Sequence, residues 1–163
     1  MILLQAKTIA ETIFAELGPH CERIAIAGSI RREKAEVKDV EIVCIPRPYE
    51  TGLFESGIAL VVNRWEKVKG ELPCKYTQRI LPQGIKLDLF FATRENWGFQ
   101  LAVRTGSAEY SHKVLANGWV RNGFHSEDGI LIYRDGRRYI IPEEMDLFAL
   151  ANVRWIEPRY REV

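Results

Sequence analysis

Charged carboxylates interrupt two of the most apolar runs in this sequence. Residues 37–45 alternate as a β-strand does, with Asp39 and Glu41 on one face and apolar side chains on the other. Asp88 lies in a second such run, at 85–91. Because an unpaired charge is costly to bury, a fold that covers these strands needs something cationic beside them. In the simpler alternative, the carboxylates lie on a solvated face of the sheet.

A Gly28-Ser29 turn comes shortly before the first of these runs. It follows an expected strand at 23–27 and begins a short helix through Arg32, which Ser29 is expected to cap. Such an element offers backbone N–H groups and a hydroxyl to an anion such as phosphate. Arg32, together with Arg31, would neutralise phosphate charge, although a single arginine is more often a solvated surface residue.

Apolar periodicity and turn residues predict an α+β fold in two units. Helices are expected at 6–17, 58–69, 97–103, 107–116 and 142–151, with a loop around Gly52. Hairpins are expected at 76–91, around Pro82-Gln83-Gly84, and at 129–141, around Asp135-Gly136. The pattern changes at Thr105-Gly106, which predicts a boundary between units 1–104 and 105–163.

Composition excludes several classes of protein. The 163 residues are 47% hydrophobic and 28% charged, as is usual for a globular protein with a sizeable core. With 23 basic and 22 acidic residues the net charge is +1, so tight non-specific DNA binding through many phosphate contacts is not expected. No apolar run approaches the roughly twenty residues that span a bilayer. Cys21, Cys44 and Cys74 form no metal-spaced pair, which predicts a reducing, cytoplasmic location.

The carboxylates predict a site for divalent metal ions. Asp39 and Glu41 share a strand face, and Asp88 joins them if its strand is a neighbour. Such an oxygen-rich site suits two Mg²⁺ ions, for which Mn²⁺ can substitute. Neither His nor Cys has ligand spacing, so zinc is not expected.

Taken together, four motifs resemble those of the family X DNA polymerases of the nucleotidyltransferase superfamily. They are Gly28-Ser29-x-Arg31-Arg32, Asp39-Val40-Glu41, Leu87-Asp88-Leu89 and Thr105-Gly106-Ser107. The run from Asp146-Leu147-Phe148 to Trp155-Ile156-Glu157-Pro158 is similar to the end of that family's nucleotide-selecting subdomain. The resemblance implies a nucleotidyltransferase-type palm over 1–104, built on a mixed sheet with flanking helices. A small α+β nucleotide-selecting subdomain would follow over 105–163.

The resemblance also implies two sets of site residues. The catalytic and metal-binding set is Asp39, Glu41 and Asp88, of which Asp88 would also accept the proton of the primer 3′-hydroxyl. The nucleotide-binding set is Gly28, Ser29, Arg32, Thr105, Gly106 and Ser107. Ser29 and Arg32 would hold the β and γ phosphates, and the Thr105-Gly106 backbone would approach the sugar and base.

The activity implied is the addition of nucleotides to a DNA primer 3′-hydroxyl, in gap filling or end processing during DNA repair. The partners implied are a nucleoside triphosphate and a primer–template or gapped DNA, bound by a monomer. Only one helix precedes the first catalytic strand, a minimal form that suggests a viral, phage or prokaryotic enzyme. The family usually has Asp where Glu41 stands, and an aromatic pair in place of Val103-Arg104.

Two alternatives stay open. The first keeps the transferase chemistry but changes the acceptor to RNA, a small molecule or a protein, as the near-zero net charge favours. The second is a catalytically silent module that binds nucleotides or DNA ends. It is motivated by Glu41, which stands where the family usually has Asp.

Overall fold

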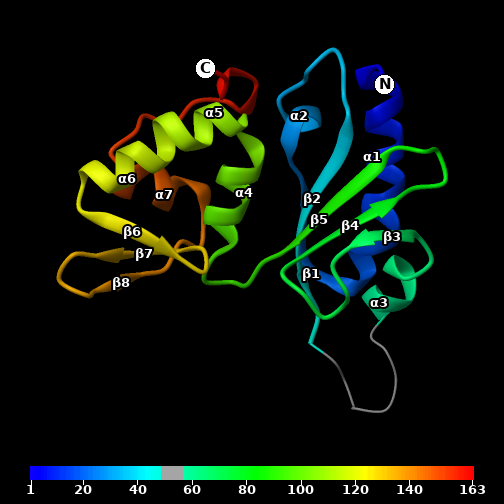
Figure 1. Ribbon diagram of the computed structural model, residues 1–163, viewed down its shortest axis with the longest axis horizontal. Helices are drawn as coiled ribbons and strands as arrows, with labels where there is room; N and C mark the ends of the chain where they lie inside the picture. The colour runs from blue at the N-terminus through cyan, green and yellow to red at the C-terminus, as the bar shows by residue number, and fades with distance from the viewer. Residues whose placement is uncertain (49–56) are drawn as a thin grey trace. The chain divides into compact units, whose positions relative to one another are not determined.

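The protein is a mixed α+β chain that divides into two compact units. The computed structural model describes residues 1–48 and 57–163, and the units are Met1–Ala92 and Thr93–Val163 (Figure 1). The division falls one helix before the expected boundary at 104/105, because the helix at 97–105 contributes Ala102 to the core of the second unit. The loop expected around Gly52 lies outside the described residues. None of the described helices combines the length and hydrophobicity needed to cross a membrane.

A mixed sheet forms the centre of the first unit. In the described part of this unit its five strands lie in the order β1-β2-β5-β4-β3. They are β1 (Cys21–Ile26), β2 (Asp39–Pro46), β3 (Glu66–Lys69), β4 (Tyr76–Ile80) and β5 (Lys86–Phe91). The central strands β2 and β5 are parallel, and the other neighbours pair antiparallel. The two strands that carry the carboxylates are therefore direct neighbours.

Helices cover one face of this sheet. The helix α1 (Leu3–Leu17) lies beside α3 (Gly57–Val62), and both pack against the sheet (Figure 1). The side chains that α1 buries follow helical periodicity, as predicted: Ala6, Ile9, Ala10, Ile13 and Leu17. They join a core with alternate residues of the two central strands, among them Val40 and Leu87. Because strand side chains alternate, the carboxylates of β2 and β5 are left for the opposite face.

The helix expected at 58–69 ends at Val62, so the prediction is confirmed only for its first part. Residues Glu66–Lys69 form β3, which pairs with β4 and places Lys67 opposite Arg79. Local periodicity in 58–69 favours a helix, but the partner strand lies farther along the chain. Tertiary pairing decides the structure of such a short segment.

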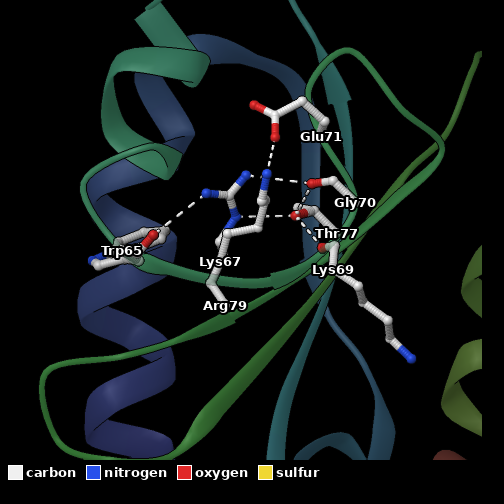
Figure 2. Close-up of polar contacts among 7 residues, drawn as sticks. All are labelled: Trp65, Lys67, Lys69, Gly70, Glu71, Thr77 and Arg79. Carbon is white, nitrogen blue, oxygen red and sulfur yellow. Dashed lines mark hydrogen bonds and ion pairs between the residues drawn. The ribbon is translucent and has the colours of Figure 1, made fainter.

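A buried arginine holds the β3–β4 hairpin together (Figure 2). Arg79 is 3% exposed, and its guanidinium donates to the carbonyls of Trp65 and Gly70 and to the Thr77 hydroxyl. The Thr77 hydroxyl in turn donates to the carbonyls of Lys69 and Gly70. Arg79 lies opposite Leu87 in the sheet, so this network belongs to the helix-covered face. It satisfies carbonyls that a helix over these residues would have used internally.

The second unit combines helices with a small antiparallel sheet. In order, its elements are α4 (Trp97–Thr105), α5 (Ala108–Tyr110), the π-helical η2 (Ser111–Ala116), α6 (Asn117–Arg121), β6 (Phe124–Glu127), β7 (Ile130–Tyr133), β8 (Arg138–Tyr139), α7 (Glu144–Ala151) and η3 (Pro158–Tyr160). The β7–β8 hairpin confirms the prediction at Asp135-Gly136, and β6 adds a third strand that was not predicted.

The helix expected at 107–116 does not stop at Asn117-Gly118. It continues through η2 and α6 to Arg121. A Cβ added at Gly118 would lie 2.7 Å from the Ala151 carbonyl oxygen, so this glycine permits a close approach of α6 to α7. The same residue type serves helix ends and helix contacts, and the sequence alone does not separate the two roles.

Candidate catalytic carboxylate site

Strand register brings three carboxylates to one face of the first unit's sheet. Asp39 begins β2, and Glu41, two residues farther on, lies directly opposite Asp88 of β5. Asp39 and Glu41 are half-buried, and Asp88 is 8% exposed. This is the face opposite α1 and its core. The acidic residues singled out from the sequence therefore share one region of the fold.

Two of these carboxylates repel each other. Burial raises the pKa of Asp39 above its ordinary value, and the negative charge of Asp88 raises it further. Lys38 and Arg32 act in the opposite direction and lower the pKa of Asp39. Excess negative charge in a half-buried place favours the binding of a cation.

Replacing Asp39 by Asn should stabilise the fold at neutral pH. Because its pKa is raised in the fold, protonated Asp39 stabilises the native state below the ordinary pKa of about 4. That contribution is lost as the pH rises through the raised value. Without divalent cations, we expect Asp39→Asn to raise the Tm at pH 7 by on the order of 1–2 °C.

The check is the Tm of both proteins from pH 3 to pH 8. The advantage of Asp39→Asn should shrink as the pH falls. A difference that is constant over the whole range, or a lower Tm for the variant at pH 7, would contradict this account.

Two side chains of β4 hold Asp88. The Tyr76 hydroxyl and Gln78 Nε2 both donate to Asp88 Oδ1, the latter at 2.8 Å. Gln78 lies opposite Asp88 and Tyr76 lies opposite Phe90, so all four side chains occupy the carboxylate face. The sequence analysis did not identify Tyr76 and Gln78 as site residues. Within the expected hairpin at 76–91, the alternation of side chains places both of them on the same face as Asp88.

Glu41 lies against the Gly28 turn. Gly28 has a φ of +61°, and a Cβ added there would be 1.6 Å from Glu41 Oε2. The Ala27 N–H also donates to the Glu41 carbonyl at 2.8 Å. The left-handed conformation favours glycine at position 28, and a side chain added there would displace the Glu41 carboxylate.

The donor set suits a hard divalent cation in its chemistry. Carboxylate oxygens are the ligands that Mg²⁺ and Mn²⁺ prefer. In residues 1–48 and 57–163, however, no three His, Cys, Asp or Glu side chains gather closely enough to hold a metal ion. Glu41, the third carboxylate, lies against the Gly28 turn.

The Gly28-Ser29 turn departs from expectation in one respect. The N-cap of α2 (Gly28–Arg31) is Ala27, and no side chain caps this helix, so the expected role of Ser29 as a cap is wrong. The Ser29 hydroxyl is buried and has no hydrogen-bond partner among the described residues. Arg32, which ends this element, is near enough to act on the charge of Asp39.

The Thr105-Gly106-Ser107 turn belongs to the second unit, whereas the other expected site residues belong to the first. Thr105 is fully buried at the end of α4. The Gly106 N–H donates to the Ala102 carbonyl at 3.2 Å, and the Ser107 N–H donates to the Arg161 carbonyl at 3.0 Å. The Ser107 hydroxyl accepts from the Tyr110 N–H, which caps the next helix. These donors and this hydroxyl serve the unit's own structure, so any contact with a nucleotide would use other atoms of the turn.

Comparison with models of known protein families gives no match, and a search among curated proteins gives none.

Proposed function

We propose that this chain is a metal-dependent nucleotidyltransferase of the family X DNA polymerase type. The first unit would be the palm and the second the nucleotide-selecting subdomain. The observation that carries the proposal is the parallel pairing of β2 with β5, which puts Asp39, Glu41 and Asp88 on one sheet face. The contact between Glu41 and Gly28 adds the glycine turn to the same region.

The residues have separate roles in this proposal. Asp39 and Asp88 would hold the divalent ions, and Glu41 would join them by turning from Gly28. When bound, Mg²⁺ or Mn²⁺ would acidify the primer hydroxyl and neutralise charge on the triphosphate. Asp88 Oδ1 is held by Tyr76 and Gln78, which leaves Oδ2 to accept the proton of the attacking hydroxyl. The hydroxyl oxygen would form a bond to the α-phosphorus of the nucleotide, the bond between that phosphorus and the oxygen bridging to the β-phosphate would break, and pyrophosphate would leave.

The glycine turn would bind the phosphates. The unpartnered hydroxyl of Ser29 would donate to a phosphate oxygen, which would relieve the cost of burying it unsatisfied. Arg32 would neutralise phosphate charge beside Asp39. Substrate positioning and charge neutralisation would then provide the catalysis.

An incorporation assay tests the proposal. The protein is incubated with labelled dNTPs or NTPs, with Mg²⁺ or Mn²⁺, and with gapped duplex, single-stranded primer or no acceptor. We expect incorporation into gapped duplex that stops on chelation and is absent from Asp39→Asn. No incorporation under any condition, with a Mn²⁺ affinity that Asp39→Asn does not change, would refute the enzymatic proposal.

Transfer to another acceptor is the second candidate function. The net charge of +1 favours it, because a protein without a strong basic excess is poorly suited to hold a long duplex. Incorporation into single-stranded primer or RNA, or labelling of protein without added acceptor, would select this candidate. Incorporation that does not depend on the template sequence would exclude templated synthesis but would still support transferase activity.

A further inference from the structure

Asp88 receives two hydrogen bonds on the same oxygen. Tyr76 and Gln78 both donate to Oδ1 from the neighbouring strand β4. Two donors on one oxygen restrict the rotation of a carboxylate and make its two oxygens inequivalent. Because Asp88 is only 8% exposed, water cannot readily replace a donor that is removed.

The donors themselves are held in place. The Tyr76 ring stacks on Phe90, its register partner, with centroids 4.9 Å apart and an interplanar angle of 23°. The Lys69 ammonium lies 5.3 Å from the centroid of the same ring. The register of β4 on β5 places Gln78 opposite Asp88. The donors are thus set by strand pairing and ring packing, before any ligand binds.

The same strand uses its two faces for different purposes. Thr77 and Arg79 point to the helix-covered face, where they bind carbonyls of the β3–β4 hairpin (Figure 2). Tyr76 and Gln78 alternate with them and point to Asp88. A buried polar network on one face therefore stiffens the strand that presents the two donors on the other.

We propose that Tyr76 and Gln78 are positioning residues for Asp88. They hold Oδ1 and so present Oδ2 to the metal ion and to the proton of the attacking hydroxyl. This inference rests on the proposed function, because it assigns the orientation of the same carboxylate. A small rotation of the group that receives the proton is enough to slow catalysis strongly, since a 1 Å displacement can cost about 100-fold.

Two substitutions remove the donors with little change in shape. Tyr76→Phe keeps the ring on Phe90, and Gln78→Met keeps the side-chain length. We expect each to lower kcat by about 10- to 100-fold, with a nucleotide KM within about threefold of the native value, since positioning affects the transition state more than substrate binding. The double variant should fall further than either single variant.

Mn²⁺ affinity provides a second readout that needs no turnover. Titration of free Mn²⁺ by EPR should show weaker binding in both single variants, by about tenfold, as removal of an outer-shell partner typically does. Tyr139→Phe makes the same atomic change in the small sheet of the second unit and is the matched control. It should leave kcat, KM and Mn²⁺ affinity unchanged.

The outcomes separate this inference from the proposed function. A native protein that incorporates nucleotide while both variants match it in kcat and Mn²⁺ affinity would overturn the positioning role alone. A native protein that binds Mn²⁺ without incorporation would overturn the proposed function, and the Mn²⁺ affinities of the variants would then decide the positioning role. A native protein that shows no incorporation and no Mn²⁺ binding would overturn both the proposed function and the positioning role. If Tyr76→Phe does not fold, the half-buried Gln78→Met decides.

Discussion

Asp88→Asn should reduce nucleotide incorporation by about 10³-fold while the fold stays intact. Asn keeps an oxygen that accepts from Tyr76 and Gln78, so the two hydrogen bonds on this position can persist. The variant loses the negative charge and the oxygen that would accept the proton. Steady-state kcat/KM and Mn²⁺ titration measure the loss, and the Tm measures the fold.

The thermal stability of Asp88→Asn should not fall below that of the native protein. The charge of Asp88 contributes to the raised pKa of Asp39, so its removal should lower that pKa and relieve the repulsion. We therefore expect Asp88→Asn to have a Tm at pH 7 that is equal to or above the native value. Asp135→Asn, in the exposed β7–β8 turn, is the matched control and should retain native incorporation. Incorporation by Asp88→Asn within tenfold of the native rate would remove Asp88 from the reaction.

Alternation in the sequence predicts the faces of β2 and β5 but not their pairing. Val40 and Ile42 are buried and Asp39 and Glu41 half-buried, as a period of two requires. That β5 lies beside β2 depends on the intervening chain crossing over to form α3, β3 and β4, and no local signal in 37–45 specifies it. The sequence resemblance already names the three carboxylates, and this long-range register is what brings them to one face of the sheet.

The side-chain partners within the site were harder to predict than its carboxylates. Tyr76 and Gln78 are ordinary strand residues by composition, and their contact with Asp88 follows from one register of the β4–β5 hairpin. The position of Glu41 against Gly28 depends on a rotamer, which the sequence does not specify. Ser29 was expected to cap α2, but the helix begins at Gly28 and its N-cap is Ala27, two residues before Ser29.

In the second unit, the end of the chain supports the Thr105-Gly106-Ser107 turn. Arg161 is fully buried, and its carbonyl accepts the Ser107 N–H. The Arg161 guanidinium donates to Glu144 at 2.7 Å and to the Ile156 carbonyl at 3.0 Å. The guanidinium carbon of Arg161, Cζ, lies 4.9 Å from the Phe148 ring centroid and 5.4 Å from the Trp155 ring centroid. Nothing in the sequence distinguishes this arginine from its exposed neighbour Arg159.

Arg161→Met should destabilise the second unit by about 3–5 kcal/mol, the usual cost of breaking a buried ion pair from one side. Met keeps apolar contact with the rings but leaves the Glu144 carboxylate, 11% exposed, without its guanidinium. Urea denaturation followed by tryptophan fluorescence is the measurement, since Trp97, Trp119 and Trp155 all belong to this unit.

Two further variants decide whether burial of the charge is the cause. Arg159→Met removes a cation whose pair with Glu157 has a similar distance, 2.8 Å, but whose side chains are each 53% exposed. It should cost at most about 1 kcal/mol, as exposed pairs do. Combining Arg161→Met with Glu144→Leu should regain most of the loss, because an apolar pair needs no counter-charge. Equal losses in the free energy of unfolding for Arg161→Met and Arg159→Met would show that the buried ion pair does not anchor the segment around Arg161. The support of the Thr105-Gly106-Ser107 turn would then rest on the backbone hydrogen bond between Ser107 and Arg161 alone.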